Sequence, residues 1–180
     1  MRHHFYVLHF DQPVLGSDDA TRGLRVVFWQ PSATELVPPG LGGAVFKVWW
    51  VFHQLRVFAN RSYALLLIYD GERLVHRSGV YPRYFRFPFM GDRDLQIGDT
   101  WTDPEYRGRG LAQAAIVRIA RVMAEPGRSL WYLAEIENEA SVRVIQRLGF
   151  TFVGRGERTS RLGIRALGHF RLAAKENEEL

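Results

Sequence analysis

The spacing of apolar residues along the first third of the chain predicts two strands and a helix. Phe5–Phe10 and Leu24–Trp29 are short apolar segments separated by a turn-rich stretch, as expected for strands. Over 44–58 the apolar residues recur mainly every three or four positions, which predicts a helix with a broad buried face that ends near Asn60. The adjacent tryptophans Trp49-Trp50 are expected either to fill the core or to line a pocket.

The middle of the chain predicts a hairpin followed by a further strand. The aliphatic run Tyr63–Tyr69, the turn at 70–73 and the returning strand Leu74–Val80 form the clearest hairpin, because the turn contains the Asp-Gly pair typical of such connections. The stretch Tyr81–Met90 mixes aromatic residues with arginines and is interrupted by two prolines. It leads into a strand over Leu95–Thr102.

A strand, a glycine-rich bend and a helix follow one another in the second half of the chain. The bend Arg107–Gly110 comes after Asp103-Pro104-Glu105, and the helix Leu111–Ala124 is stopped by Pro126-Gly127. The remaining predicted elements are the strand Ser129–Ile136, an N-cap at Asn138, the helix Glu139–Leu148, a C-cap at Gly149, the strands Phe150–Gly154 and Gly168–Ala173, and a charged tail, Lys175–Leu180.

Length and composition restrict the class of protein. A chain of 180 residues is expected to form a single domain, and 47% hydrophobic with 24% charged residues is too apolar for a disordered protein. The longest aliphatic run, Ala64–Ile68, is much shorter than a membrane span, and the N-terminal residues lack an apolar signal segment, so we expect a cytoplasmic protein. The absence of cysteine excludes disulfides, thiolate nucleophiles and cysteine-bound metals. Six dispersed histidines offer no His-x-x-x-His pair, so no metal site is expected.

The charge of the chain is basic and is carried almost entirely by arginine. The net charge is +5, and because only Lys47 and Lys175 are lysines, 22 of the 24 basic residues are arginines. A guanidinium binds a phosphate or carboxylate at two points, so this composition favours an anionic ligand such as a nucleotide cofactor. Codon bias is the alternative explanation of the excess of arginine over lysine, and it implies no function.

The glycine-rich bend is a candidate phosphate site. Between a strand and a helix, such a bend leaves backbone N–H groups pointing at one spot, where the helix dipole also favours negative charge. Gly108 and Gly110 permit a ligand to approach the backbone closely, and Arg107 and Arg109 add positive charge. The bend matches neither G-x-G-x-x-G nor the P-loop, so from spacing alone a plain turn stays open.

Two segments carry a resemblance to a known family. Segment 102–112, TDPEYRGRGLA, resembles the acyl-CoA-binding motif R/Q-x-x-G-x-G/A of the GNAT superfamily of N-acyltransferases, with Arg107, Gly110 and Ala112 at the matching positions. Downstream, the sequences at 138–141 and 146–150 resemble the second motif of that family at the family's spacing. The resemblance covers roughly residues 65–154.

The resemblance implies a mixed α/β (α+β) GNAT-like fold. Its central sheet is mostly antiparallel, two adjacent parallel strands splay apart, and helices flank the sheet. Residues 1–60 would then be a variable N-terminal part, 61–154 the acyl-CoA-binding core, and 155–180 a C-terminal strand and tail.

The resemblance also implies acetyl-CoA or another acyl-CoA as co-substrate. Asn138 and Ser141 would contact the pantetheine arm from one side, and the strand edge at Trp101 and Thr102 would pair with it from the other. The residues implied to hold the pyrophosphate are Arg107, Gly108, Arg109, Gly110, Leu111 and Ala112.

The implied reaction is transfer of an acyl group, expected to be acetyl, to a primary amine. Without cysteine no acyl-enzyme thioester can form, so the amine attacks directly in a ternary complex. A backbone N–H within 100–102 is the expected oxyanion donor. Strict alternation along 95–102 puts Asp99 on the same face as Ile97 and Trp101, where burial suits it to act as general base. An arginine partner for Asp99, or a β-bulge beside it, is the structural alternative.

Other groups are candidates for moving protons. The alternatives to Asp99 as base are Asp94, Glu135, Glu137 and His76. Many GNAT members carry, four residues before the Gly-Phe pair, a tyrosine that protonates the leaving thiolate, but Ile145 stands there in this chain. Ser141 or water is expected to replace it, or the thiolate leaves unprotonated. An inactive descendant that only binds CoA is a further reading.

The acceptor is the least defined part of the prediction. Aromatic rings interleaved with arginines, as in Tyr81–Met90, stack on bases and bind phosphates. The middle of the chain also loosely resembles acyltransferases that act on nucleotide-linked amino sugars. Together these features indicate a nucleotide-linked amino sugar as acceptor. The structural alternative is that these rings are buried or pair two subunits in a homodimer. A protein or peptide N-terminus, or another small amine, is the second acceptor class. A nucleic-acid-binding module is the competing function, suggested by a pI of about 9.9, but it leaves both motifs without a role.

Overall fold

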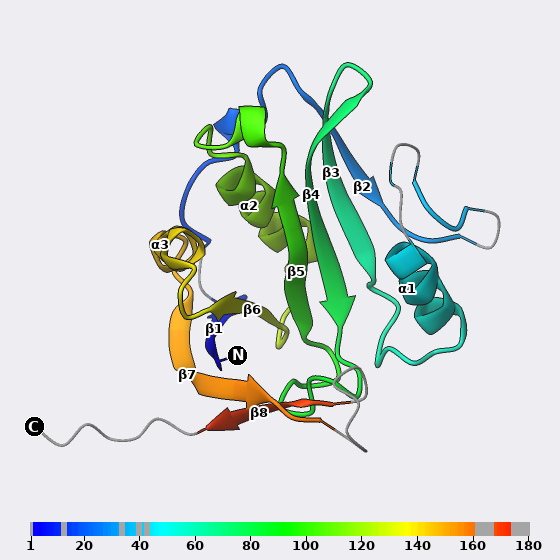
Figure 1. Cartoon of the computed structure of the whole chain (residues 1–180), viewed down its shortest axis with the longest axis vertical. Coiled ribbons are helices and arrows are strands. Elements are labelled where there is room, and N and C mark those ends of the chain that lie inside the picture. The colour runs from blue at the N-terminus through cyan, green and yellow to red at the C-terminus, as the bar shows by residue number, and fades with distance from the viewer. Residues whose placement is uncertain are drawn as a thin grey trace, which may run out of the picture.

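Eight strands form one sheet in the computed structural model, which describes residues 2–11, 14–32, 35–38, 41, 44–160 and 168–173 (Figure 1). The strand order is β2-β3-β4-β5-β6-β1-β7-β8. All neighbouring strands are antiparallel except β5 and β6, which are parallel. The strands are β1 (Arg2–His9), β2 (Arg25–Trp29), β3 (Ala64–Asp70), β4 (Arg73–Pro82), β5 (Leu95–Thr102), β6 (Ser129–Glu135), β7 (Thr151–Arg158) and β8 (Phe170–Ala173).

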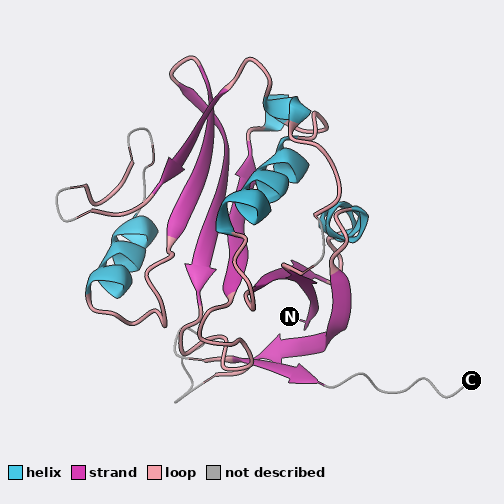
Figure 2. Ribbon diagram, turned by 180° about the vertical axis from the view of Figure 1, so that it is seen from behind, coloured by secondary structure: helices cyan, strands magenta, loops and turns pink. Residues whose placement is uncertain are grey.

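Helices cover both faces of the sheet. In the described residues these are α1 (Ala44–Gln54), α2 (Leu111–Met123) and α3 (Glu139–Arg147), with 3-10 turns η1 (Asp19–Thr21) and η2 (Pro104–Tyr106). One core, rich in aliphatic side chains, joins α2 and α3 to one face, and Figure 2 shows α2 lying along that face. The second core, rich in aromatic rings, joins α1 and the segment after β4 to the other face. The predicted mixed sheet flanked by helices is confirmed.

Most predicted elements are present, with shifted ends. β5 has the predicted bounds, and the hairpin strands, α2, β6 and α3 differ from prediction by no more than two residues at either end. β7 continues to Arg158 because it pairs with β1 along one edge and with β8 along the other. The predicted charged tail lies outside the described residues.

α1 is shorter and less buried than the sequence predicted. It ends at Gln54, and Arg56 adopts a left-handed φ of 56°, a conformation that stops a helix. Phe46 is buried and Trp49 packs edge-to-face on Tyr81 with ring centroids 5.1 Å apart, so Trp49 has the core role of the two that were expected. The predicted broad buried face is wrong, because four of the apolar side chains assigned to it are exposed: Val45, Val48, Leu55 and Val57.

The two parallel strands separate halfway along their length. β5 pairs with β6 only through Leu95, Gln96 and Ile97, opposite Leu130, Trp131 and Tyr132. Beyond this point β5 stays paired with β4, and β6 stays paired with β1. The sheet therefore opens between residues 98–102 and 133–135, and Figure 1 shows β6 turning away from β5. This confirms the expected splayed strands.

A β-bulge interrupts β5 just inside this opening. Arg77 of β4 lies opposite Trp101, whereas Gly79 lies opposite Gly98, so β5 holds one surplus residue, and Asp99 has a φ of 48°. Ile97 belongs to the aliphatic core, and the hydroxyl of Thr100 also bonds on that side, to Ser78. The predicted strict alternation along 95–102 is therefore wrong, because the bulge moves Thr100 and Thr102 to the α2 face and leaves Asp99 and Trp101 on the α1 face.

Candidate active site

The glycine-rich bend opens directly into the first turn of α2. Gly108 and Gly110 have φ of 75° and 79°, left-handed values that glycine adopts without strain, and Gly110 is the N-cap of α2. The helix ladder begins where the Ala114 N–H donates to the Gly110 carbonyl at 3.0 Å. The N–H groups at 111–113 precede this ladder and have no helix carbonyl to bind, so they are free to receive an anion.

The segment before the bend is anchored on the β3–β4 hairpin. Asp103 is buried, accepts a hydrogen bond from the Glu105 N–H at 3.0 Å, and is held by Arg73 at 2.8 Å. Desolvation acts to raise the pKa of Asp103, but the Glu105 N–H and the Arg73 guanidinium outweigh it and leave the pKa below its usual value. The Tyr106 hydroxyl donates to Asp70 at 2.6 Å. These contacts fix the start of the bend relative to β5.

The two arginines of the bend are exposed. The Arg109 guanidinium lies over the Tyr106 ring at 4.6 Å, and Arg107 Nε donates to the Thr102 carbonyl at 3.3 Å. Both residues belong to the bend that leads directly into α2, so their exposed charges can add to that of its first turn.

α3 begins on the other side of the gap. The Asn138 side-chain oxygen accepts a hydrogen bond from the Ser141 N–H at 3.1 Å, so Asn138 caps this helix as predicted. Its side-chain amide group keeps its own N–H donors. Asn138 is exposed and Ser141 half-buried, so both can be reached from solvent.

A row of hydrogen-bonded side chains lies on the α2 face of β4 and β5, beside the gap. His76 Nδ1 is 2.8 Å from Thr102 Oγ1, and His76 Nε2 is 3.0 Å from Ser78 Oγ. Ser78 Oγ lies 3.2 Å from Thr100 Oγ1. Burial raises the pKa of Tyr132 on β6, and the hydroxyls of Ser141 on α3 and of Thr100 act against this stronger effect. The hydrogen-bonded row itself links β4 and β5.

His76 is sealed inside the protein. Burial lowers its pKa to about 4, and nearby Arg77 acts in the same direction, so the imidazole is neutral at physiological pH. Because both ring nitrogens are hydrogen-bonded and the residue has no exposed surface, it can exchange a proton only through Thr102 or Ser78. Direct contact with an acceptor, which its prediction as base requires, is blocked in this structure.

Asp99 is not buried as predicted. Its side chain is 35% exposed and pairs with Arg77, whose Nε and Nη2 lie 3.2 Å from the two carboxylate oxygens. The Arg77 guanidinium also lies over the rings of Phe46 and Trp101, at 5.5 and 5.4 Å. The expected burial beside Ile97 is wrong, whereas the arginine partner and the β-bulge of the structural alternative are both present. The role of Asp99 in catalysis stays a prediction.

The other carboxylate candidates are spread around β5 and β6. Asp94 precedes the paired end of β5 and is buried, where it accepts hydrogen bonds from the N–H groups of Gly91 and Ser129 and from Trp131 Nε1, each at 2.9 Å. With these three hydrogen bonds, Asp94 has a structural role. Glu135 and Glu137 are exposed near the end of β6.

Sequence reasoning named the backbone of 100–102 but did not single out the side chains of Ser78, Thr100 and Tyr132, which lie beside the gap. The signal that could have identified Ser78 and Thr100 is a polar residue at every second position of an otherwise apolar strand. On β5 the bulge interrupts this alternation, so the pattern cannot be recognised there. Tyr132 gives no such signal, because a tyrosine in a strand is most simply explained as core.

The rings of Tyr81–Met90 are mostly used inside the protein. Tyr84, Phe87 and Met90 are buried in the aromatic core, and Phe87 stacks on Phe170 with centroids 5.5 Å apart, whereas Phe85 is 47% exposed. Burial of the rings, one of the structural alternatives, therefore describes this stretch better than a base-stacking surface.

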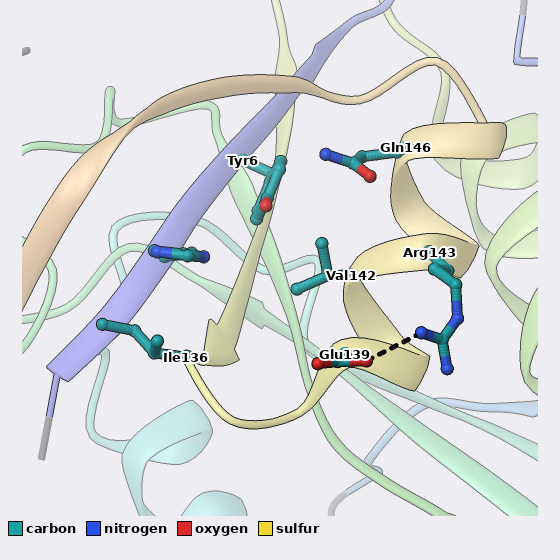
Figure 3. Close-up of a pocket in the computed structure, with 7 residues that line it drawn as sticks. Tyr6, Ile136, Glu139, Val142, Arg143 and Gln146 are labelled. Carbon is teal, nitrogen blue, oxygen red and sulfur yellow. Dashed lines mark hydrogen bonds and ion pairs between the residues drawn. The ribbon is translucent and has the colours of Figure 1, made fainter.

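A hollow of about 360 Å³ lies between β1 and α3 (Figure 3). An ion pair between Glu139 and Arg143, 3.0 Å long, lies at its edge. Its lining residues are His4, Tyr6, Ile136, Glu139, Val142, Arg143 and Gln146. None of these is a predicted site residue, and none belongs to β5.

The described part of the chain shows neither a metal-binding cluster nor a membrane-spanning helix. It contains no group of three or more His, Cys, Asp or Glu side chains that could hold a metal ion. None of its helices is both long and apolar enough to cross a membrane.

Comparison with known proteins supports one family. A profile described as the acetyltransferase (GNAT) family matches residues 31–150. The chain is 32% identical over 72 residues to thialysine N-epsilon-acetyltransferase of Sus scrofa, a match that covers 39% of this chain and 41% of that protein. The chain therefore spans about two fifths of the curated relative that it matches.

Solved structures share the fold at low identity. A GNAT-family putative acetyltransferase from Novosphingobium aromaticivorans has 20% identity and a TM-score of 0.51, with 86% of this chain and 62% of that one covered. A GCN5-related N-acetyltransferase from Sphaerobacter thermophilus has 18% identity and a TM-score of 0.54, with 86% and 49% covered. The opened parallel pair, the glycine bend ahead of α2 and a profile match over 120 of 180 residues lead to one assignment: the chain belongs to the GNAT family of acetyltransferases.

Proposed function

We propose that this chain transfers an acetyl group from acetyl-CoA, the co-substrate of its family, to a primary amine. The observation that carries the proposal is the opening between β5 and β6, which ends beside the free N–H groups of the first turn of α2. An anion bound at that turn and an extended arm laid in the opening fit the two halves of CoA, its diphosphate and its pantetheine chain.

Particular residues are proposed for each half. The N–H groups of 109–112 receive the diphosphate, with the Arg107 and Arg109 side chains as additional cations. The edge of β5 at 101–102, which does not pair with β6, offers backbone partners to the pantetheine amides once Arg107 turns from the Thr102 carbonyl to the diphosphate. Asn138 and Ser141 face the arm from α3.

The chemistry follows from this placement. The amine nitrogen attacks the thioester carbonyl carbon, a C–N bond forms, and the C–S bond breaks to release CoA. A backbone N–H within 100–102 is proposed to stabilise the negative charge on the carbonyl oxygen. Asp99 presents its carboxylate on the α1 face of the opening, away from α2, and is proposed to attract the acceptor ammonium there and to take its proton.

Three acceptors should be assayed first. The 72-residue similarity to a thialysine acetyltransferase makes thialysine the first small amine to test. A nucleotide-linked amino sugar, predicted from the arginines of 81–90, is the second, and the exposed Phe85 is the ring of that stretch best placed to stack on a base. A peptide N-terminus is the third arm of the panel.

The test has a binding step and a chemical step. Saturating acetyl-CoA is expected to raise the melting temperature by mass action, and Gly110→Trp is expected to abolish that increase by blocking the bend. Product mass spectrometry on the acceptor panel then identifies the acetylated amine. An unchanged melting curve in wild-type protein at millimolar acetyl-CoA would contradict the proposal.

A further inference from the structure

Arg77 is held in place on the α1 face of the sheet. Its Nε and Nη2 each lie 3.2 Å from an oxygen of Asp99. Its guanidinium carbon also lies over the Phe46 ring of α1, at 5.5 Å, and over the Trp101 ring of β5, at 5.4 Å. A carboxylate and two ring faces together restrict the rotation of a guanidinium. Arg77 is therefore a preorganised cation.

The Arg77 guanidinium keeps donors that Asp99 does not use. A guanidinium carries N–H groups along its side edge, at Nε and Nη2, and at its end, at Nη1 and Nη2. Asp99 accepts from the side edge, and no other acceptor among the described residues binds this guanidinium. The end of the guanidinium is thus a free fork, which matches the two oxygens of a carboxylate. Because 26% of the side chain is exposed, a ligand can reach it.

The order of the strands places this fork behind Asp99 as seen from the opening. β5 borders the opening, and β4 is the next strand on the side away from β6 (Figure 1). Asp99 belongs to β5 and Arg77 to β4. An acceptor on the α1 face with its amine at the opening therefore lies across β5 and extends toward Arg77. Because the two side chains are in contact, an anion on the fork lies only about one or two carbon atoms from an amine beside Asp99.

The bulge in β5 brings these groups to one face. It lets Asp99 and Trp101 lie on the α1 face with Arg77, while Ile97 of the same strand stays in the aliphatic core. Asp99 adopts its left-handed φ of 48° at this point, a conformation that costs energy for a residue with a side chain. Bulges that re-aim a side chain are common beside active sites. The bulge therefore supports a functional reading of the Asp99–Arg77 pair.

The charges of the pair decide which acceptor it favours. Arg77 already balances the charge of Asp99, so a lone ammonium would add a net positive charge to a partly buried site. An amine that also carries a carboxylate adds no net charge, because its ammonium faces Asp99 while its carboxylate faces Arg77. A peptide N-terminus is disfavoured by the same argument, since a neutral peptide group stands where an amino acid has its carboxylate.

We propose that the acceptor is an amino acid whose carboxylate lies one or two carbon atoms from its amine, and that the free fork of Arg77 binds this carboxylate. This inference rests on the proposed function and names its substrate class. Arg77 is then a specificity-determining residue, which touches the acceptor away from the reacting nitrogen. Its side edge keeps Asp99 in place beside that nitrogen.

Matched acids and amides test the substrate class. The full chain is saturated with acetyl-CoA, and kcat/KM is measured for glycine, L-alanine and β-alanine and for the amide of each. The acid that reacts best should exceed its amide by about tenfold or more, as expected for a two-point contact between charged groups. The amine of an amide is less basic and more often neutral near pH 7, so a preference for the acid cannot come from the amine itself. Equal values for acid and amide, or a preference for the amides, in wild-type protein would overturn the inference.

Arg77→Gln and Arg25→Gln form a matched pair of variants. Arg25 also lies over an aromatic ring on the α1 face, 4.2 Å from the centroid of Tyr69, but it belongs to β2, two strands further from the opening. Both variants lose one positive charge, and only Arg77→Gln loses the fork. The ratio of acid to amide should fall about tenfold or more in Arg77→Gln and stay at the wild-type value in Arg25→Gln. Equal falls would mean that the ratio follows net charge, and the role of Arg77 would be wrong.

Binding of acetyl-CoA separates this inference from the proposed function. Failure of wild-type protein to bind acetyl-CoA in a calorimetric titration overturns both. Binding of acetyl-CoA together with faster acetylation of a peptide N-terminus than of the three acids overturns the amino-acid class alone. If Arg77→Gln does not fold, Arg77→Lys keeps the charge beside Asp99 but replaces the fork by a single point of contact. Its ratio of acid to amide should fall severalfold, and an unchanged ratio there would overturn the role of Arg77.

Discussion

Protonation of His76 should destabilise the folded protein in a defined pH window. Burial lowers the pKa of His76 from 6.5 to about 4, a difference that corresponds to about 3 kcal/mol. Because the pKa is lower in the folded state, the unfolded chain binds more protons between these two values. The stabilisation is therefore complete above about pH 6.5 and is lost as the pH falls toward about 4.

Urea unfolding of wild-type protein and His76→Gln from pH 7 to pH 4 measures this contribution, since glutamine keeps a donor and an acceptor but does not titrate. The free energy of unfolding of wild-type protein should fall toward that of the variant by up to about 1.4 kcal/mol per pH unit, and by about 3 kcal/mol in all. His4 and His53, whose pKa values burial also lowers, are present in both proteins, so their effects cancel in the difference. Parallel curves for the two proteins would refute the reasoning.

Three further predictions follow from single side chains. Gly110→Ala forces a side chain into a left-handed conformation, so it should cost about 1–2 kcal/mol of stability and weaken acetyl-CoA binding. The control is Gly127→Ala, at a φ of 73° in a turn far along the chain from the bend, which should cost a similar amount of stability and bind acetyl-CoA normally. Equal losses of binding by the two variants in a thermal-shift titration would argue against the bend as the acetyl-CoA site. Tyr63→Phe removes a fully buried hydroxyl that has no hydrogen-bond partner among the described residues. Denaturant unfolding of this variant should therefore show unchanged or higher stability. A loss of more than about 1 kcal/mol would mean that the hydroxyl has a partner. Asp99→Asn should change the stability by less than about 1 kcal/mol, because the ion pair between Asp99 and Arg77 is partly exposed. The variant should nevertheless raise the KM for the acceptor amine in steady-state assays. An unchanged KM would mean that Asp99 does not belong to the acceptor site.

Elements marked by local signals could be predicted from the sequence. The Asp-Gly turn, the cap at Asn138 and the glycines of the bend depend on residues that are close in the chain, and each stands where its signal placed it. The apolar run of β3 and the helical spacing of α2 are equally local. The resemblance to two family motifs added the splayed strands, which no local pattern could have indicated.

Features set by contacts between distant segments could not be predicted. The bulge at Asp99 arises from the register between β4 and β5, so a reading of β5 alone assigns the wrong face to Thr100 and Asp99. The first strand of the chain lies between β6 and β7, which only the folded sheet reveals. Tyr132 lies at the opening because β6 pairs with β5 only as far as this residue, and the sequence shows it only as a tyrosine in an apolar strand.

The surplus residue in β5 makes this strand sensitive to changes in length as well as in composition. Deleting Gly98 would remove this residue and let β5 pair with β4 without interruption, while Thr100, Trp101 and Thr102 keep the faces that they have now. Deleting a residue elsewhere in the strand would instead exchange the faces of all side chains beyond the cut. The loss of one codon should therefore be tolerated better at the bulge than at any other point along β5.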